Sequence, residues 1–205
     1  MFTGITRGTF PITCVEQGAG VLHYEVELPD WLVVGLEVGA SVAIDGVCQT
    51  VVSVEGTRVR FDAIDETLAR TTLDTLQVGR RVGVERSYRV GDEVGGHEVA
   101  GHVLGTGVVS AREAVGDNLT LRVQVPAEWM KYLTIKGFVA IDGCSLTVGH
   151  VDPSGSFALH LIPETLRLTN LGTKAVGERV NVELDHRTVT IVDTVERVLA
   201  QRLPS

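Results

Sequence analysis

The sequence predicts an all-β protein made of two similar antiparallel barrels followed by a C-terminal helix. Three observations lead to this prediction. One block occurs twice, because Val42-Ala43-Ile44-Asp45-Gly46 recurs 97 residues later as Val139-Ala140-Ile141-Asp142-Gly143. Short runs rich in Val, Ile and Thr are broken by Gly, Asp and Pro, which is typical of small antiparallel barrels. The end of the chain carries apolar residues at helical spacing.

The repeat extends over nearly the whole chain. Glu66-Thr67-Leu68 matches Glu164-Thr165-Leu166, and residues 78–85 match residues 176–183, both at an offset of 98 residues. Such self-similarity indicates a duplicated structural unit. We therefore predict three segments, namely an N-terminal barrel, a C-terminal barrel and a tail, over residues 1–97, 98–187 and 188–205.

Within the first copy, strands are expected where β-branched residues cluster, over residues 41–44, 50–54, 58–62 and 81–85. Pro29 and Pro126 each stand where a helix could begin, since proline is favoured in the first helical turn. A short helix is therefore predicted in each barrel, at the start of the segments 29–32 and 126–133.

The tail has an apolar stripe along one side of a predicted helix, formed by Ile191, Val192, Val195, Val198 and Leu199. Asp185 is a candidate N-terminal cap or cap neighbour, and Pro204 is expected to end the helix. A helix of this length is marginal alone in water, so the stripe must be covered. It could pack on its own barrel or join subunits.

Composition excludes several classes of function. The net charge is −8, without a Lys/Arg cluster that could neutralise a phosphate backbone, so nucleic acid is a poor candidate partner. No apolar run is long enough to span a bilayer, and no secretory signal is apparent, so a cytoplasmic protein is expected. Cys14, Cys48 and Cys144 lack the spacing of a disulfide framework or a zinc site. We expect no metal.

Positions where the two copies differ are the most informative about chemistry. Three pairs stand out: Cys48 against Ser145, Ile5 against His102, and Ser41 against Phe138. Each has an ordinary structural explanation as well. A cysteine in a Val-rich strand is more often a small buried apolar residue than a nucleophile, and a lone histidine is usually a surface or hydrogen-bonding residue.

Several motifs in this order resemble the riboflavin synthase family. They are Met1-Phe2-Thr3-Gly4-Ile5, Gly46-Val47-Cys48-Gln49-Thr50-Val51, Gly95-Gly96-His97, Gly101-His102-Val103, Met130-Lys131-Tyr132, Lys136-Gly137, Asp142-Gly143-Cys144-Ser145-Leu146-Thr147-Val148 and Leu161-Ile162-Pro163-Glu164-Thr165-Leu166. The resemblance covers residue 1 to about residue 200.

The resemblance implies two six-stranded Greek-key barrels and a homotrimer gathered by the C-terminal helix. It also implies dismutation of two molecules of 6,7-dimethyl-8-ribityllumazine into riboflavin and 5-amino-6-(D-ribitylamino)uracil, with no cofactor. In the family, the working site lies between the N-terminal barrel of one subunit and the C-terminal barrel of its neighbour. An association with lumazine synthase is left open.

Carried over residue by residue, the resemblance implies two matching sets of substrate contacts. In the N-terminal barrel they are Gly4, Ile5, Thr6, Ser41, Cys48, Gln49, Thr50, Asp62, Ala63, Ile64, Asp65, Glu66 and Thr67. In the C-terminal barrel they are Gly101, His102, Val103, Lys136, Ser145, Leu146, Thr147, His160, Leu161, Ile162, Pro163, Glu164 and Thr165. Many of these contacts are expected to use backbone groups.

Four residues are expected to influence turnover: Cys48, His102, Ser145 and Asp185. His102 or a Ser145/Asp185 pair would manage proton transfer and Cys48 would assist, with the division of roles open. Gln49 and Ala100 depart from the family pattern, where an apolar residue and a serine are common.

A non-catalytic module is the main rival, because lumazine proteins share the fold and hold a lumazine or flavin as a chromophore. A twin-barrel protein without a ligand is a third reading. The polar residues of the second copy, including His102, Ser145 and Asp185, favour the enzyme.

Overall fold

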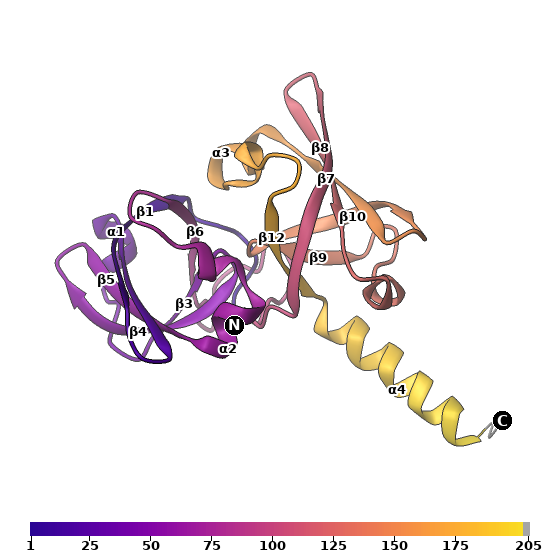
Figure 1. Cartoon of the computed structure of the whole chain (residues 1–205), viewed down its shortest axis with the longest axis horizontal. Coiled ribbons are helices and arrows are strands. Elements are labelled where there is room, and N and C mark those ends of the chain that lie inside the picture. The colour runs from indigo at the N-terminus through magenta and orange to yellow at the C-terminus, as the bar shows by residue number, and fades with distance from the viewer. Residues whose placement is uncertain (203–205) are drawn as a thin grey trace.

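The computed structural model describes residues 1–202, which form two closed six-stranded antiparallel barrels side by side and one long helix (Figure 1). The N-terminal barrel contains β1 (Thr9–Gln17), β2 (Val21–Glu27), β3 (Ser41–Ile44), β4 (Val47–Glu55), β5 (Arg58–Ile64) and β6 (Arg81–Arg86). The C-terminal barrel contains β7 (Gly105–Val115), β8 (Asn118–Gln124), β9 (Phe138–Ile141), β10 (Cys144–Asp152), β11 (Ser156–Leu161) and β12 (Arg179–Leu184).

The two barrels have the same strand order, which confirms the predicted duplication. Neighbouring strands run β1-β2-β5-β4-β3-β6 in the first barrel and β7-β8-β11-β10-β9-β12 in the second. Three consecutive strands form a meander, and an earlier strand returns beside the last of them, which is Greek-key connectivity.

Each barrel is filled by its own apolar core, so neither barrel interior is a binding cavity. Alternate residues of every strand point inward, as strand geometry requires. Tyr24 and Phe61 stack at 5.5 Å between ring centroids inside the first barrel, and Phe157 is fully buried inside the second. Any ligand face must therefore lie on the outside of the barrels.

Short helices close the barrels. The predicted one after Pro29 is present as α1 (Asp30–Val33), and the one after Pro126 is a 3₁₀ helix, η2 (Ala127–Tyr132). Short helical connections are commonly closed by the tighter i→i+3 bonds of a 3₁₀ helix. The others are α2 (Asp65–Arg70), η1 (Thr72–Thr75), α3 (Pro163–Leu168) and η3 (Leu171–Thr173).

The C-terminal helix α4 (His186–Arg202) extends away from the second barrel (Figure 1). Asp185 is its N-terminal cap, as predicted, because its Oδ2 accepts hydrogen bonds from the backbone N–H and hydroxyl of Thr188. The helix begins two residues before the predicted Thr188. Pro204 lies outside the described residues. Across residues 1–202, no helix combines the length and apolarity needed to cross a membrane.

The first turns of α4 contact the second barrel through η2. Tyr132 donates a hydrogen bond to Asp193 at 2.5 Å, and Lys131 donates one to Glu196 at 2.5 Å. The stripe of Ile191, Val195, Val198 and Leu199 remains 39–64% exposed. The barrel of the same subunit therefore leaves this stripe uncovered.

The two barrels come very close together at Gly46 and Gly143. A Cβ atom added to Gly46 would lie 2.3 Å from the backbone nitrogen of Gly143, and both residues have positive φ. Only glycine allows two backbones to approach this closely in this conformation. The repeated Asp-Gly turn is therefore where the two copies touch.

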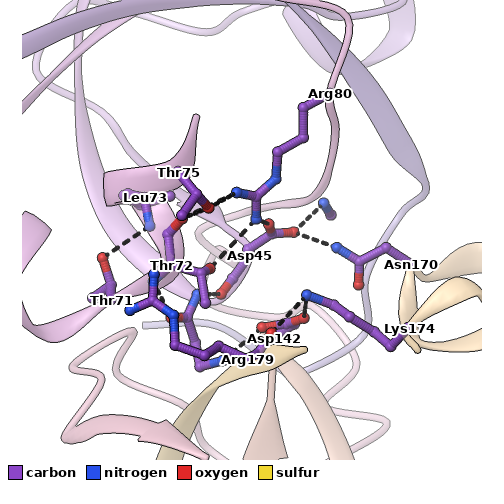
Figure 2. Close-up of polar contacts among 12 residues, drawn as sticks. Asp45, Thr71, Thr72, Leu73, Thr75, Arg80, Asp142, Asn170, Lys174 and Arg179 are labelled. Carbon is purple, nitrogen blue, oxygen red and sulfur yellow. Dashed lines mark hydrogen bonds and ion pairs between the residues drawn. The ribbon is translucent and has the colours of Figure 1, made fainter. Parts of the chain in front are cut away.

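Buried polar groups connect the barrels beside these turns (Figure 2). Asp45 accepts hydrogen bonds from the Gly83 N–H at 2.6 Å and from the Asn170 amide of the other barrel at 2.9 Å, and it pairs with Arg80 at 2.9 Å. Burial and the charge of Asp142 raise the pKa of Asp45 to about 6. A hollow of about 730 Å³ lies next to this cluster, and none of the predicted site residues lines it.

Candidate functional site

The cysteine and the serine that distinguish the two copies occupy equivalent places on the outside of their barrels. In β4, Val47, Gln49 and Val51 are buried, whereas Cys48 is half-buried and Thr50 is exposed. In β10, Ser145 and Thr147 have the same outward positions. Two matching outer faces therefore carry the predicted reactive residues.

In the N-terminal barrel, this face is polar with an apolar margin. Ser41 pairs with Thr50 across β3 and β4, so both side chains belong to the same face. On β5, Asp62 lies 2.6 Å from His23, and Ile64 is 56% exposed. An exposed isoleucine beside hydroxyl and carboxylate groups could contact the ring of an amphiphilic ligand while they bind its polar part.

The C-terminal barrel repeats this face with different side chains. Phe138 pairs with Thr147 across β9 and β10 and stands where Ser41 does in the first copy. His160 lies 3.0 Å from the hydroxyl of Thr120, and Ile162 is exposed. Both faces thus combine an exposed isoleucine with polar groups.

Seven predicted contact residues are buried: Gly4, Thr6, Gln49, Ala63, Gly101, Leu146 and Leu161. The Gln49 side chain accepts a hydrogen bond from the Tyr24 hydroxyl at 3.2 Å inside the barrel. Ligand contacts at these positions would have to use backbone groups, as the sequence analysis expected for many of the contacts. The uncommon Gln49 therefore fills the core and presents no side chain on the outer face.

The remaining predicted contacts lie at the edges of the two faces. Asp65, Glu66 and Thr67 form the first turn of α2, and Pro163, Glu164 and Thr165 form that of α3. Lys136 precedes β9 with a positive φ, and the side chain of Ile5 approaches Gly95. Val103 packs against the core of the first barrel.

Glycine loops contact the predicted reactive residues of the two barrels at the shared interface. The Cys48 N–H donates to the Gly101 carbonyl at 2.9 Å, and the Ser145 N–H donates to the Gly4 carbonyl at 2.8 Å. Both glycines have positive φ, and a Cβ atom at either would lie within 2.7 Å of the facing Cβ atom. The predicted contacts are thus joined pairwise across the barrel interface, Gly101 with Cys48 and Gly4 with Ser145.

His97 is a functional candidate that the sequence offered only as part of the Gly95-Gly96-His97 motif. Its Nδ1 lies 2.6 Å from the Ser145 hydroxyl, and its ring stacks on Phe138 at 5.1 Å between centroids. Burial lowers the pKa of His97, while the nearby charge of Asp185 opposes this shift. The Gly95-Gly96-His97 motif was the available signal. Its importance follows from a contact across 48 residues of sequence.

Asp185 lies between two hollows of the C-terminal barrel. One, of about 540 Å³, is lined by His102, Tyr132 and Asp185, and the other, of about 590 Å³, by His97, Phe138 and Asp185. Burial would raise the pKa of Asp185, but hydrogen bonds from Thr188 and Arg187 outweigh it and lower the pKa. Asp185 therefore remains a carboxylate near both histidines.

The four predicted catalytic residues are not gathered at one point. Ser145 and Asp185 are associated through His97, and His102 shares a hollow with Asp185. Cys48 lies on the other barrel, against Gly101. Within residues 1–202, no three His, Cys, Asp or Glu side chains gather in a way that could hold a metal ion.

Comparisons with known proteins place this geometry in a family. The family model described as "Lumazine binding domain" matches residues 3–87 and again residues 100–185. Riboflavin synthase of Escherichia coli (strain K12) is 47% identical over 203 residues, which is 98% of this chain and 95% of that protein.

Solved structures of the protein LumP are also similar. The LumP complex with riboflavin has a TM-score of 0.84 at 25% identity and covers 91% of this chain and 100% of that one. The LumP complex with 6,7-dimethyl-8-(1'-D-ribityl) lumazine has a TM-score of 0.79 at 27% identity and covers 89% and 98% of the two chains.

Proposed function

The chain belongs to the riboflavin synthase family, as its motifs predicted, and we propose that it carries out that family's reaction on the two outer barrel faces described above. Each face would bind one molecule of 6,7-dimethyl-8-ribityllumazine. A four-carbon unit would then pass from one molecule to the other, giving riboflavin and 5-amino-6-(D-ribitylamino)uracil.

The observation that carries this proposal is the pair of matching faces with unequal reactive residues. Two copies of one substrate need two similar binding faces, and the matching outward positions of Cys48 and Ser145 support such a pair of faces. Holding two reactants in the geometry for bond formation can contribute on the order of 7–11 kcal/mol to lowering the barrier. One lumazine molecule donates the four-carbon unit and the other accepts it, so the two need different surroundings. The differences between the two copies can provide these.

Proton transfer is proposed for the C-terminal barrel. The methyl group at C7 of the lumazine is acidic because its carbanion delocalises into an electron-poor ring, so a modest base can remove the proton. His97 has a lowered pKa, which keeps its imidazole neutral near pH 7, and it is hydrogen-bonded to Ser145. The Asp185 carboxylate lies nearby and would stabilise the imidazolium formed. Cys48 would assist on the N-terminal face.

We propose that the subunits assemble as a homotrimer through α4. The uncovered stripe of Ile191, Val195, Val198 and Leu199 has helical spacing suited to packing against copies of itself. In this arrangement the N-terminal face of one subunit would meet the C-terminal face of a neighbour. A cytoplasmic location and an association with lumazine synthase stay predictions.

The reaction is tested by mixing the purified protein with 6,7-dimethyl-8-ribityllumazine and separating the products by chromatography. We expect one riboflavin and one 5-amino-6-(D-ribitylamino)uracil for every two lumazine molecules consumed. Binding of lumazine without riboflavin formation would instead favour a chromophore-holding module like LumP. If the protein bound neither the lumazine nor riboflavin, this result would favour a twin-barrel protein without a ligand.

Variants of the reactive residues test their assignment. Cys48→Ser, His97→Gln and His102→Gln are expected to lower turnover while leaving the oligomer intact, and an unchanged rate in His97→Gln would refute its role as the base. Cys14→Ser and His150→Gln are matched controls, because these residues of β1 and β10 are not among the predicted substrate contacts. Unchanged rates in both Cys48→Ser and His102→Gln would remove the two residues from the chemistry.

Assembly is tested by placing a charge on the α4 stripe. Val195→Glu is expected to dissociate the trimer, since a buried unpaired carboxylate costs several kcal/mol in an apolar contact. Gln201→Glu adds the same charge off the stripe and should leave the mass measured by sedimentation unchanged. A stable trimer in Val195→Glu would refute this role of the stripe.

A further inference from the structure

Two buried glutamates lie at equivalent positions of the repeat, beside the reactive residues. Glu85 on β6 and Glu183 on β12 are 4% and 7% exposed, and each lacks a salt-bridge partner among the described residues. Burial raises the pKa of both carboxyls. An unpaired buried carboxyl is costly, so a structural or functional need must maintain it.

Each glutamate belongs to a three-strand ladder that ends at a reactive residue. Ala43 pairs with Glu85 on one side and with Cys48 on the other, so these side chains share one face of the first barrel. Ala140 pairs with Glu183 and Ser145 in the same way. The two alanines pack together at the barrel interface, so the two ladders face each other.

The glutamates hold the glycine loops of their own barrels. Glu183 accepts the Ala100 N–H at 2.7 Å on one oxygen and the Gly101 N–H at 2.9 Å on the other. Glu85 accepts the backbone N–H and hydroxyl of Thr3 at 2.7 and 2.8 Å on one oxygen. Hydrogen bonds to a carboxylate are stronger than those between neutral groups, so both loops are firmly fixed.

Each held loop reaches across the interface to the other barrel. The Gly101 carbonyl, next to the Glu183 contact, accepts the N–H of Cys48 in the first barrel. The Gly4 carbonyl, next to the Glu85 contact, accepts the N–H of Ser145 in the second barrel. The connection is therefore crossed, since each barrel's glutamate acts on the other barrel's reactive residue.

We propose that Glu183 and Glu85 are positioning residues for the reaction, Glu183 fixing Cys48 through the Gly101 loop and Glu85 fixing Ser145 through the Gly4 loop. This inference rests on the proposed roles of Cys48 and Ser145. It makes the reactive residue of each face depend on the opposite barrel of the same subunit. The two faces of one subunit are thereby held in a fixed orientation relative to each other.

The crossed pattern is tested with Glu183→Gln and Glu85→Gln in the full-length protein. Glutamine keeps the volume but replaces one acceptor oxygen with a donor, so Glu183→Gln must lose one of its two loop contacts. A Cβ atom added to Gly101 would lie 2.7 Å from the Cys48 Cβ, so this loop packs closely against Cys48, and loosening the loop is expected to give a reagent more access to the thiol. Alkylation of each cysteine by iodoacetamide is followed by peptide mass spectrometry, together with turnover.

In Glu183→Gln we expect Cys48 to be alkylated about fivefold faster, because the attack depends on access to the thiol. We expect kcat to fall about tenfold, because small displacements of reactive groups are costly. Cys14, which lies in β1 of the same barrel, serves as the internal reference and should keep its rate. Glu85→Gln should leave the alkylation rate of Cys48 as in the wild type.

Three results would overturn the proposal: an unchanged Cys48 rate in Glu183→Gln, equal acceleration of Cys48 and Cys14, or wild-type kcat alongside faster Cys48 alkylation. Should Glu183→Gln fail to fold, Glu183→Asp retains the charge but is one methylene short, and the same readouts apply. A Cys48→Ser variant with full turnover would refute the proposed role of Cys48. The alkylation pattern would still report whether the Glu183 contact positions it.

Discussion

The close contact of Gly46 with Gly143 predicts a large cost for adding one methyl group. In Gly46→Ala the new Cβ would lie 2.3 Å from the Gly143 nitrogen and 2.7 Å from its Cα, and both of these are backbone atoms that cannot rotate away. Gly46 also has a φ of +80°. An L-residue in this region costs about 1–2 kcal/mol. Overpacking adds about 1–3 kcal/mol.

Gly79→Ala separates these two contributions. Gly79 has a φ of +88°, and a Cβ atom there would meet nothing within 4 Å. It carries the conformational cost alone. We therefore expect Gly46→Ala to lower the free energy of unfolding by about 2–5 kcal/mol and Gly79→Ala by about 1–2 kcal/mol.

Urea unfolding followed by tryptophan fluorescence measures both variants, because Trp31 lies in α1 of the first barrel and Trp129 in η2 of the second. Turnover should also fall in Gly46→Ala, since the loops that reach Cys48 and Ser145 cross the same interface. Equal destabilisation by the two substitutions would mean that the barrels can move apart without cost. The reasoning about a fixed interface would then be wrong.

Two further predictions concern the polar cluster between the barrels. With the pKa of Asp45 raised to about 6 from 3.8, the folded protein holds a proton that the unfolded chain releases between about pH 4 and 6. The free energy of unfolding should therefore fall by on the order of 2–3 kcal/mol as pH rises through this window, and Asp45→Asn should lose this decline. A wild-type pH profile in Asp45→Asn would contradict the assignment. Lys174→Met leaves the 1% exposed Asp142 carboxylate without its ion-pair partner at 3.2 Å and should cost about 3 kcal/mol in urea unfolding. A loss below about 1 kcal/mol would show that water or neighbouring groups compensate.

The duplication could be predicted because the same blocks of residues occur twice along the chain. The recurring Val-Ala-Ile-Asp-Gly block indicates two copies of one unit, and runs of β-branched residues indicate where their strands lie. The α4 stripe and the Asp185 cap are likewise local patterns that the structure bears out. The family assignment also followed from the sequence, because its motifs occur in a specific order.

The environment of the site could not be predicted, because it depends on contacts between distant segments. His97 contacts Ser145 only once the segment that joins the two barrels has folded against β10. Its role therefore could not be predicted from the sequence. Gln49 was expected at the ligand face, but its side chain turns inward to Tyr24. Successive residues of a strand point to opposite sides of the sheet. The side on which a given residue lies is therefore certain only once the register of the strand is known.

The sequence by itself determined the number of barrels and the difference between Cys48 and Ser145 that makes them unequal. The tertiary structure alone decided that two glycine turns abut, that Asp45 and Asp142 are buried together, and that each barrel's glutamate holds a loop against the other barrel. Periodicity and repeats are properties of neighbouring residues along the chain. Burial, pKa and crossed contacts arise only from the packing of segments that lie far apart in sequence.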